Sequence, residues 1–242
     1  MKKKNVGIIG NGKWGKKIIN ELQKISNIKF VYNSKNNFKN YEKEIDWIFI
    51  LTPDSTHYNI TKFFLKKKVN VFCEKPLSIK IKEAQSLIEL SRRIKSRLYV
   101  DDIENYKKKK IRINKDINYI IRTKRDKGSV KSLLNRLAYH DFYLLSEFLE
   151  LKKIASVQVL NSKKFLEFKI ILNNKKIFNF HYNISSKIKK HQINKISLDK
   201  FKNNPMRDML MSVLYKKKNF KRNNLDALKC IRLINKISKK IK

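Results

Sequence analysis

Glycine, proline and cysteine are scarce in this chain of 242 residues, which contains 5 glycines, 3 prolines and 2 cysteines. The two cysteines, Cys73 and Cys230, are too few for a disulfide framework, so we expect a reduced, cytoplasmic setting. No apolar run approaches the roughly 18 residues that a membrane-spanning helix needs, and we expect no membrane association. The basic start Met1–Lys4 precedes an apolar stretch that polar residues soon interrupt, which argues against a signal peptide.

Acidic side chains are also few, 20 against 59 lysines and arginines, and the formal net charge is +39. Such a charge is typical of nucleic-acid-binding proteins. The lysines are nevertheless spread along the whole chain together with abundant Asn, Ile, Phe and Tyr. This pattern favours a genome-wide drift toward A/T-rich codons over a selected basic patch, so we do not expect nucleic acid as a partner. The positive field would still attract anionic substrates at low salt.

Four of the five glycines lie in the segment Val6–Gly15. A short apolar run there leads into a Gly-x-Gly-x-x-Gly pattern at Gly10, Gly12 and Gly15, and apolar residues then recur at helical spacing. In a dinucleotide-binding loop one glycine makes the tight turn, one lets the backbone approach a pyrophosphate, and one lets the helix pack on the strand. The sequence therefore predicts such a loop, against the alternative of a strand-to-helix turn that binds nothing.

The chain is long enough for two small domains. Apolar strand patterns alternate with helical patterns in the first 101 residues, with strands at 28–32, 46–51, 69–73 and 97–101 and helices at 60–65 and 81–88. This alternation predicts an α/β fold, a Rossmann domain over residues 1–101. From residue 102 apolar residues recur with period two, for example at Leu166, Phe168, Ile170 and Leu172. We therefore predict an α+β domain over 102–242 with an open, mainly antiparallel sheet, whose free face a second copy of the chain covers in a dimer or tetramer.

Three further motifs follow the glycine loop in order: Thr52-Pro53-x-x-x-His57-Tyr58, Glu74-Lys75-Pro76-Leu77-Ser78 and Leu137-Ala138-Tyr139-His140-Asp141. With these motifs, most of the chain resembles the glucose–fructose oxidoreductase/inositol dehydrogenase/MocA family. The resemblance implies an NAD(P)-dependent oxidoreductase that transfers hydride between nicotinamide and a hydroxyl or carbonyl carbon of a sugar or nucleotide-sugar. It also implies a Rossmann domain followed by an open-sheet domain that binds a small-molecule substrate.

The residues that we expect to contact the cofactor are Gly10, Gly12, Lys13, Trp14, Gly15, Asn33, Ser34, Lys35, Thr52, Pro53, His57, Glu74 and Lys75. Asn33, Ser34 and Lys35 follow the second predicted strand, where an acidic residue would bind the ribose 2′-hydroxyl of NAD. A neutral and basic segment favours NADP over NAD. The alternative is that Lys35 is one more surface lysine.

The resemblance implies two catalytic residues, Lys75 and His140. The family's matching lysine contacts the reacting oxygen and assists proton movement, and histidine titrates near neutral pH. We expect His57 to pack and hydrogen-bond beneath the nicotinamide site. His181 is expected on the polar side of a strand, either on the sheet surface or lining the substrate cleft, and His191 in a lysine-rich loop without a role.

Two departures from the family pattern concern the substrate. Arg136 occupies the position four residues before His140 where the family usually has an aspartate, and the segment Tyr106–Lys115 is short. We predict that the substrate residues are Lys75, Arg136, His140 and Asp141, with Arg136 holding an anionic group and Asp141 orienting His140. The alternatives are an exposed Arg136 and a non-catalytic NAD(P)-binding protein with a degenerate pocket. No spacing typical of metal ligands is present.

Overall fold

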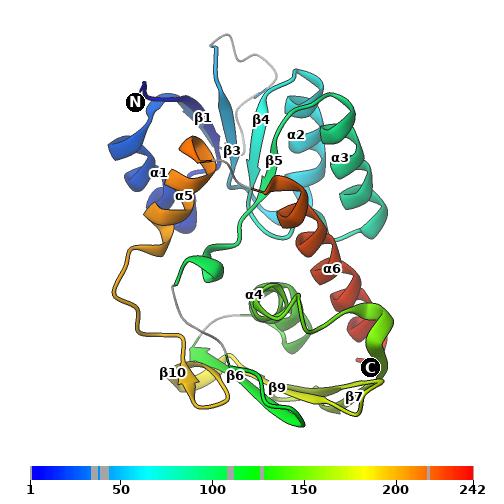
Figure 1. Cartoon of the computed structure of the whole chain (residues 1–242). Coiled ribbons are helices and arrows are strands. Elements are labelled where there is room, and N and C mark those ends of the chain that lie inside the picture. Colours follow the sequence, from blue (N-terminus) through cyan, green and yellow to red (C-terminus); the bar gives the residue numbers. More distant parts are fainter. Residues whose placement is uncertain are drawn as a thin grey trace. The chain divides into compact units, whose positions relative to one another are not determined.

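The structure, a computed structural model, describes residues 2–33, 38, 44–107, 112–125, 128–216 and 219–241 (Figure 1). They form two compact units, each with its own sheet. Unit 1 consists of Met1–Tyr106 and Pro205–Ile231, and unit 2 of Lys107–Asn204 and Arg232–Lys242. The division expected from the sequence, after residue 101, differs from this one because the segment Pro205–Ile231 returns to the first unit.

Unit 1 contains a five-stranded parallel sheet with the strand order β2-β1-β3-β4-β5. Its elements are β1 (Asn5–Ile9), α1 (Lys13–Ile25), β2 (Asn27–Tyr32), β3 (Trp47–Ile50), α2 (Asp54–Lys66), β4 (Asn70–Cys73), α3 (Ile81–Arg93), β5 (Leu98–Val100), a 3₁₀ turn (Ile103–Tyr106), α5 (Pro205–Tyr215) and the first part of α6 (Phe220–Ser238). Helices α1 and α5 cover one face of the sheet, and α2 and α3 the other (Figure 1). The predicted Rossmann-like α/β fold is confirmed.

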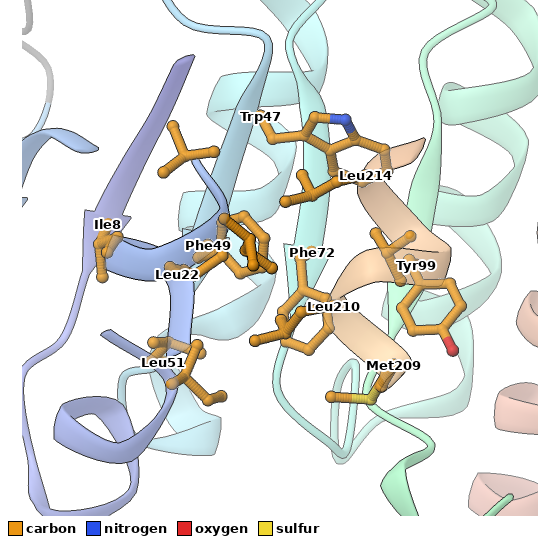
Figure 2. Packing of buried hydrophobic residues seen from close by; sticks show 14 residues of the cluster. Ile8, Leu22, Trp47, Phe49, Leu51, Phe72, Tyr99, Met209, Leu210 and Leu214 are labelled. Carbon is orange, nitrogen blue, oxygen red and sulfur yellow. The ribbon is translucent and has the colours of Figure 1, made fainter. Parts of the chain in front are cut away.

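The central strand β3 is apolar along its whole length because helices cover both faces of the sheet. All four residues of β3 are buried, and the rings of Phe49 and Phe72 from neighbouring strands stack with centroids 4.9 Å apart. Met209, Leu210 and Leu214 of α5 pack against this layer (Figure 2). Burial of each such side chain stabilises the fold by about 1.5–3 kcal/mol, which explains why the segment Pro205–Ile231 belongs to unit 1.

Unit 2 contains a six-stranded sheet with the order β11-β10-β6-β9-β8-β7. Its strands are β6 (Ile117–Arg125), β7 (Ile154–Asn161), β8 (Leu166–Leu172), β9 (Ile177–Asn183), β10 (Ser185–Ile193) and β11 (Ile196–Ser197). Neighbouring strands are antiparallel except β6 and β9, which pair in parallel. The prediction of a mainly antiparallel sheet is therefore confirmed, with one parallel pair that the period-two pattern could not indicate.

One face of this sheet is packed, as alternate burial along β8 and β9 shows. Phe168 and Phe180 stack at 4.8 Å, and Phe142 of α4 (Tyr139–Leu144) meets Phe180 edge to face at 5.4 Å. A π-helical turn, Leu134–Ala138, leads directly into α4. Among the described residues, no helix has the length and apolar character that crossing a bilayer requires.

Candidate active site

The three glycines of the loop after β1 have three different surroundings. Gly10 has a φ of +104°, and a Cβ there would lie 2.5 Å from the backbone of Leu51. A Cβ on Gly15 would lie 2.6 Å from the carbonyl oxygen of Gly10. The loop therefore needs glycine at both positions for its own folding, since a side chain at either would collide with backbone atoms.

Gly12 differs, because a Cβ there would meet no heavy atom within 4 Å. The residue is exposed and precedes the first turn of α1, which begins at Lys13 without a side-chain cap. A helix start with open N–H donors and positive partial charge binds phosphate. Nothing in the protein requires glycine at this position, whereas a pyrophosphate approaching the backbone would, so the loop fits a dinucleotide.

The other two predicted loop residues lie on α1. Lys13 is exposed at the first turn. Trp14 is partly buried against the apolar cluster of unit 1, with Lys17 Nζ 5.7 Å from the centre of its ring. The structure thus gives Trp14 a packing role, and contact of either residue with a cofactor stays a prediction.

A cavity of about 580 Å³ lies at the carboxyl ends of β1, β2 and β3. In the sheet, β2 lies next to β1 on one side and β3 lies next to β1 on the other, so the direction in which strands are added reverses between β1 and β3. Open α/β sheets bind ligands at the carboxyl ends of the strands at such a point. The described residues that line the cavity are Ile9, Asn33, Phe38, Thr52, Ser55, Thr56, Asn59, Ile60, Lys62, Phe63 and Lys66. They include Asn33 and Thr52 from the predicted set. Pro53 is exposed and caps α2, and the predicted Ser34 and Lys35 lie outside the described residues.

His57 connects the segments that follow β3 and β4. Its Nδ1 donates to the carbonyl oxygen of Pro76 at 2.7 Å and its Nε2 to that of Thr52 at 2.8 Å. Burial lowers the pKa of His57, but neighbouring Cys73 and the two carbonyls outweigh burial and raise the pKa to about 10. With only 1% of its surface exposed, His57 holds the two segments together, which agrees with a packing role beneath the site, and contact of His57 with the cofactor stays a prediction.

Lys75 and Glu74 follow β4 at the same edge of the sheet, and both are half-buried. The Glu74 amide donates to the carbonyl of Ile50 at 2.9 Å, and the Lys75–Pro76 peptide is cis. The position of Lys75 at the carboxyl end of a parallel strand agrees with a role at a ligand, and that role stays a prediction.

Sequence reasoning missed Asp101, which follows β5 and is buried beside Glu74. Its amide donates to Cys73 at 2.9 Å, and its Oδ1 accepts from the amide of Ile103 at 2.9 Å. Burial raises the pKa of Asp101 well above its usual value, and the nearby Glu74 carboxylate adds to this effect. The sequence did contain a signal. Asp101 and Asp102 form an acidic pair directly after a predicted strand, which is unusual in a chain with so few acidic residues.

In unit 2, His140 is half-buried on α4, two residues after the end of a π-helical turn that carries Arg136. The Arg136 guanidinium passes close to Gly128, where a Cβ would lie 2.3 Å from its Nη1. Gly128 has a φ of +137°. Position 128 therefore needs glycine both for its backbone conformation and to leave room for the Arg136 guanidinium.

The expectations for Asp141 and His191 need correction. Asp141 is fully buried, and its Oδ1 lies 2.6 Å from His191 Nε2 and 3.5 Å from Arg122 Nη1. Because consecutive helical residues point in different directions, Asp141 faces the packed sheet, where its carboxylate contacts His191 and Arg122. These contacts do not fit the expected role of orienting His140. His191 belongs to β10, where it is buried, rather than to a loop without a role.

Burial raises the pKa of Asp141, but His191 and Arg122 outweigh burial and lower it. His181 lies half-exposed on β9, 3.8 Å from Glu167 Oε1, which fits the expected position on the polar side of the strand. Within the part of the chain that the structure describes, no group of three or more His, Cys, Asp or Glu is arranged to hold a metal ion.

A model of the family described as "Oxidoreductase family, NAD-binding Rossmann fold" (GFO_IDH_MocA) matches residues 24–102. Residues 24–102 are thus similar to this glucose–fructose oxidoreductase/inositol dehydrogenase/MocA family. The chain is 42% identical over 48 residues to the uncharacterized oxidoreductase YgjR of Escherichia coli K12, and 38% over 52 residues to trans-1,2-dihydrobenzene-1,2-diol dehydrogenase of Danio rerio. These segments are 20% and 22% of this chain and only 15% and 16% of those relatives.

The similarity in fold to solved structures extends over the whole chain. The solved structure of UDP-N-acetylglucosamine 3-dehydrogenase GnnA from Acidithiobacillus ferrooxidans superposes with a TM-score of 0.79, covering 100% of this chain and 98% of that one. The two sequences are 16% identical, so this likeness shows a shared fold.

Proposed function

We propose that the protein is an NAD(P)-dependent oxidoreductase acting on a hydroxyl or carbonyl carbon of a sugar or nucleotide-sugar. The observation that carries the proposal is the open space at Gly12, in a loop whose other two glycines the fold itself requires. The match of residues 24–102 to the oxidoreductase family model and the likeness in fold to the UDP-N-acetylglucosamine 3-dehydrogenase GnnA support the reaction class. The residue that follows β2 is Asn33 and not an aspartate or glutamate, which supports a preference for NADP over NAD.

The residues have separate tasks in this proposal. The bound nicotinamide supplies the hydride chemistry. The loop Gly10–Gly15 and the start of α1 bind the pyrophosphate, and Lys75 donates a hydrogen bond to the reacting oxygen. His140 moves the proton, and Arg136 holds an anionic group of the substrate through its planar guanidinium.

Two further properties belong to the proposal. The large apolar side chains Tyr119, Leu160 and Ile188, on β6, β7 and β10, are exposed, which supports a dimer or tetramer that covers them. The scarcity of cysteine supports a reducing, cytoplasmic setting.

Fluorescence titration of the purified protein with NADPH and NADH tests the cofactor, and turnover on a panel of nucleotide-sugars tests the reaction. Saturable binding with a Kd in the micromolar range and oxidation of at least one panel member are expected. Failure of both cofactors to bind would contradict the proposal.

A second candidate function is that of an NAD(P)-binding protein without catalysis. One observation favours it: neither Arg136 nor Asp141 supplies a carboxylate that could orient His140, because Arg136 is a cation and Asp141 is fully buried. This alternative requires cofactor binding without turnover of any sugar in the panel.

A further inference from the structure

We propose that Lys62 and Lys66 of α2 bind the 2′-phosphate of NADP, so that a helix after β3 contributes to the choice of cofactor. The inference rests on the proposed function. It concerns the cavity of about 580 Å³ at the carboxyl ends of β1, β2 and β3, whose lining includes both lysines and Asn33.

The position of the lysines is the first argument. Lys62 and Lys66 are one helical turn apart and line the same cavity from α2. Asn33 lines it from the end of β2, the strand end at which Rossmann folds contact the adenosine ribose. Both lysines therefore line the cavity that the ribose-contacting strand end also lines.

The described lining of the cavity carries positive and no negative charge. Among the described residues that line the cavity, two are cations and none is acidic. A carboxylate here would accept hydrogen bonds from the ribose hydroxyls of NAD and would repel the 2′-phosphate of NADP. A 2′-phosphate instead brings a charge of about −1.5 to −2 and several strong acceptor oxygens, which form charge-assisted hydrogen bonds with lysine.

The remaining lining suits an adenine ring. The rings of Phe38 and Phe63 meet edge to face with centroids 5.5 Å apart, and Ile9 and Ile60 add aliphatic surface. A flat apolar base next to a charged phosphate suits a cavity whose described lining includes both aromatic rings and cations.

Lys62 is also held in place before any ligand binds. Its Nζ donates to the hydroxyl of Tyr58 at 3.2 Å and lies 5.3 Å from the centre of that ring. The side chain is partly buried, whereas Lys66 is exposed. A cation that is already restrained loses less conformational freedom on binding, so we expect Lys62 to contribute more than Lys66.

The test compares NADPH with NADH by fluorescence titration of the full chain and of the double variant Lys62→Ala/Lys66→Ala. The double variant should weaken NADPH binding at least about tenfold, which corresponds to about 1.4 kcal/mol, and leave NADH binding within about twofold. The matched control is Lys67→Ala, an exposed lysine of the same helix end that does not line the cavity. It removes one charge and should change neither affinity.

Competition by 2′,5′-ADP and by 5′-ADP isolates the 2′-phosphate. The double variant should lose competition by 2′,5′-ADP and retain that by 5′-ADP. Retained NADH binding reports a folded variant, and the single variant Lys66→Ala, at an exposed position, gives a second measurement if the double variant does not fold.

Equal weakening of NADPH and NADH in the double variant would overturn the inference and leave the proposed function intact. So would a wild-type protein that prefers NADH, or a Lys67→Ala variant that loses NADPH as strongly as the double variant. If the wild-type protein binds neither cofactor, the proposed function itself fails, and the inference fails with it.

Discussion

The Nδ1 atom of His57 lies 2.7 Å from the carbonyl oxygen of Pro76, 19 residues away in the chain. The other ring nitrogen also faces a carbonyl, that of Thr52. Carbonyl oxygens only accept hydrogen bonds, so both ring nitrogens carry protons and the imidazole is charged. A buried cation thus connects the segments after β3 and β4, next to the predicted catalytic Lys75.

This arrangement predicts a pH dependence of stability. The folded-state pKa of His57, about 10, is above the ordinary value of 6.5. The stabilisation is therefore fully present below pH 6.5 and is lost as the pH rises toward 10. His57→Gln should lower the free energy of unfolding by about 3 kcal/mol at pH 6. In urea denaturation the gap between variant and wild type should shrink between pH 7 and 10, and a constant gap would contradict the charged state.

The glycine loop allows a matched pair of substitutions. Gly10→Ala places a Cβ against the Leu51 backbone at positive φ and should destabilise the fold by about 1–3 kcal/mol. Gly12→Ala meets no atom of the protein and should destabilise it by no more than about 1 kcal/mol, the difference between glycine and alanine at the N-cap of α1. It should nevertheless weaken NADPH binding about tenfold, since a methyl group would occupy the pyrophosphate's approach. Unchanged binding by Gly12→Ala would show that no pyrophosphate lies there.

Lys75→Met separates catalysis from binding. The substitution retains the aliphatic stem and removes the donor, so turnover should fall by about a hundredfold or more while the Kd of NADPH changes less than about threefold. Single-turnover measurements with a sugar substrate check this. Lys80→Met, an exposed lysine that precedes α3, is the control. Turnover that survives Lys75→Met would remove this lysine from the chemistry.

Arg136→Ala tests the predicted anionic group of the substrate. Acidic and neutral versions of one sugar are compared, and kcat/KM for the acidic version should fall about tenfold or more, with little effect on the neutral one. The reason is that only a carboxylate or phosphate uses both arms of the guanidinium. Equal losses of kcat/KM on both sugars, or no loss on either, would show that Arg136 does not bind an anionic group of the substrate.

The buried contact between Asp141 and His191 predicts a second effect on stability. Asp141→Asn should destabilise the protein by about 3 kcal/mol at pH 7, because it removes the buried carboxylate that the Arg122 guanidinium and the His191 ring contact. The pKa of Asp141 is below its ordinary value of 3.8, so the wild-type stabilisation is present above pH 3.8 and is lost as the pH falls through the folded-state pKa. The difference between wild type and variant in urea denaturation should therefore shrink below pH 4.

The control for this prediction is His181→Gln, at a half-exposed histidine of the same sheet. It should change the free energy of unfolding by less than about 0.5 kcal/mol. If Asp141→Asn is equally mild, the buried contact does not stabilise unit 2.

The sequence by itself determined the parts of the fold that local backbone chemistry specifies. Glycine at Gly10, Gly12 and Gly15 predicts a strand–turn–helix because few other residues adopt the turn or allow the close approach. The spacing of apolar residues likewise predicted the five parallel strands of unit 1 and the alternating strands of unit 2. A strand buried on both faces is apolar throughout, and a strand buried on one face has an apolar residue at every second position.

Only the tertiary structure decided which distant segments meet. The return of α5 to unit 1, the parallel pairing of β6 with β9, and the contact of His191 with Asp141 each join residues far apart in the chain. Side-chain burial on an amphipathic element indicates that some partner covers it, and many partners satisfy the same pattern. The lysine-rich surroundings of His191 predicted a solvated loop, but pairing of β10 with β6 buries the ring. The selection among partners comes from packing and charge pairing that exist only once the chain is folded.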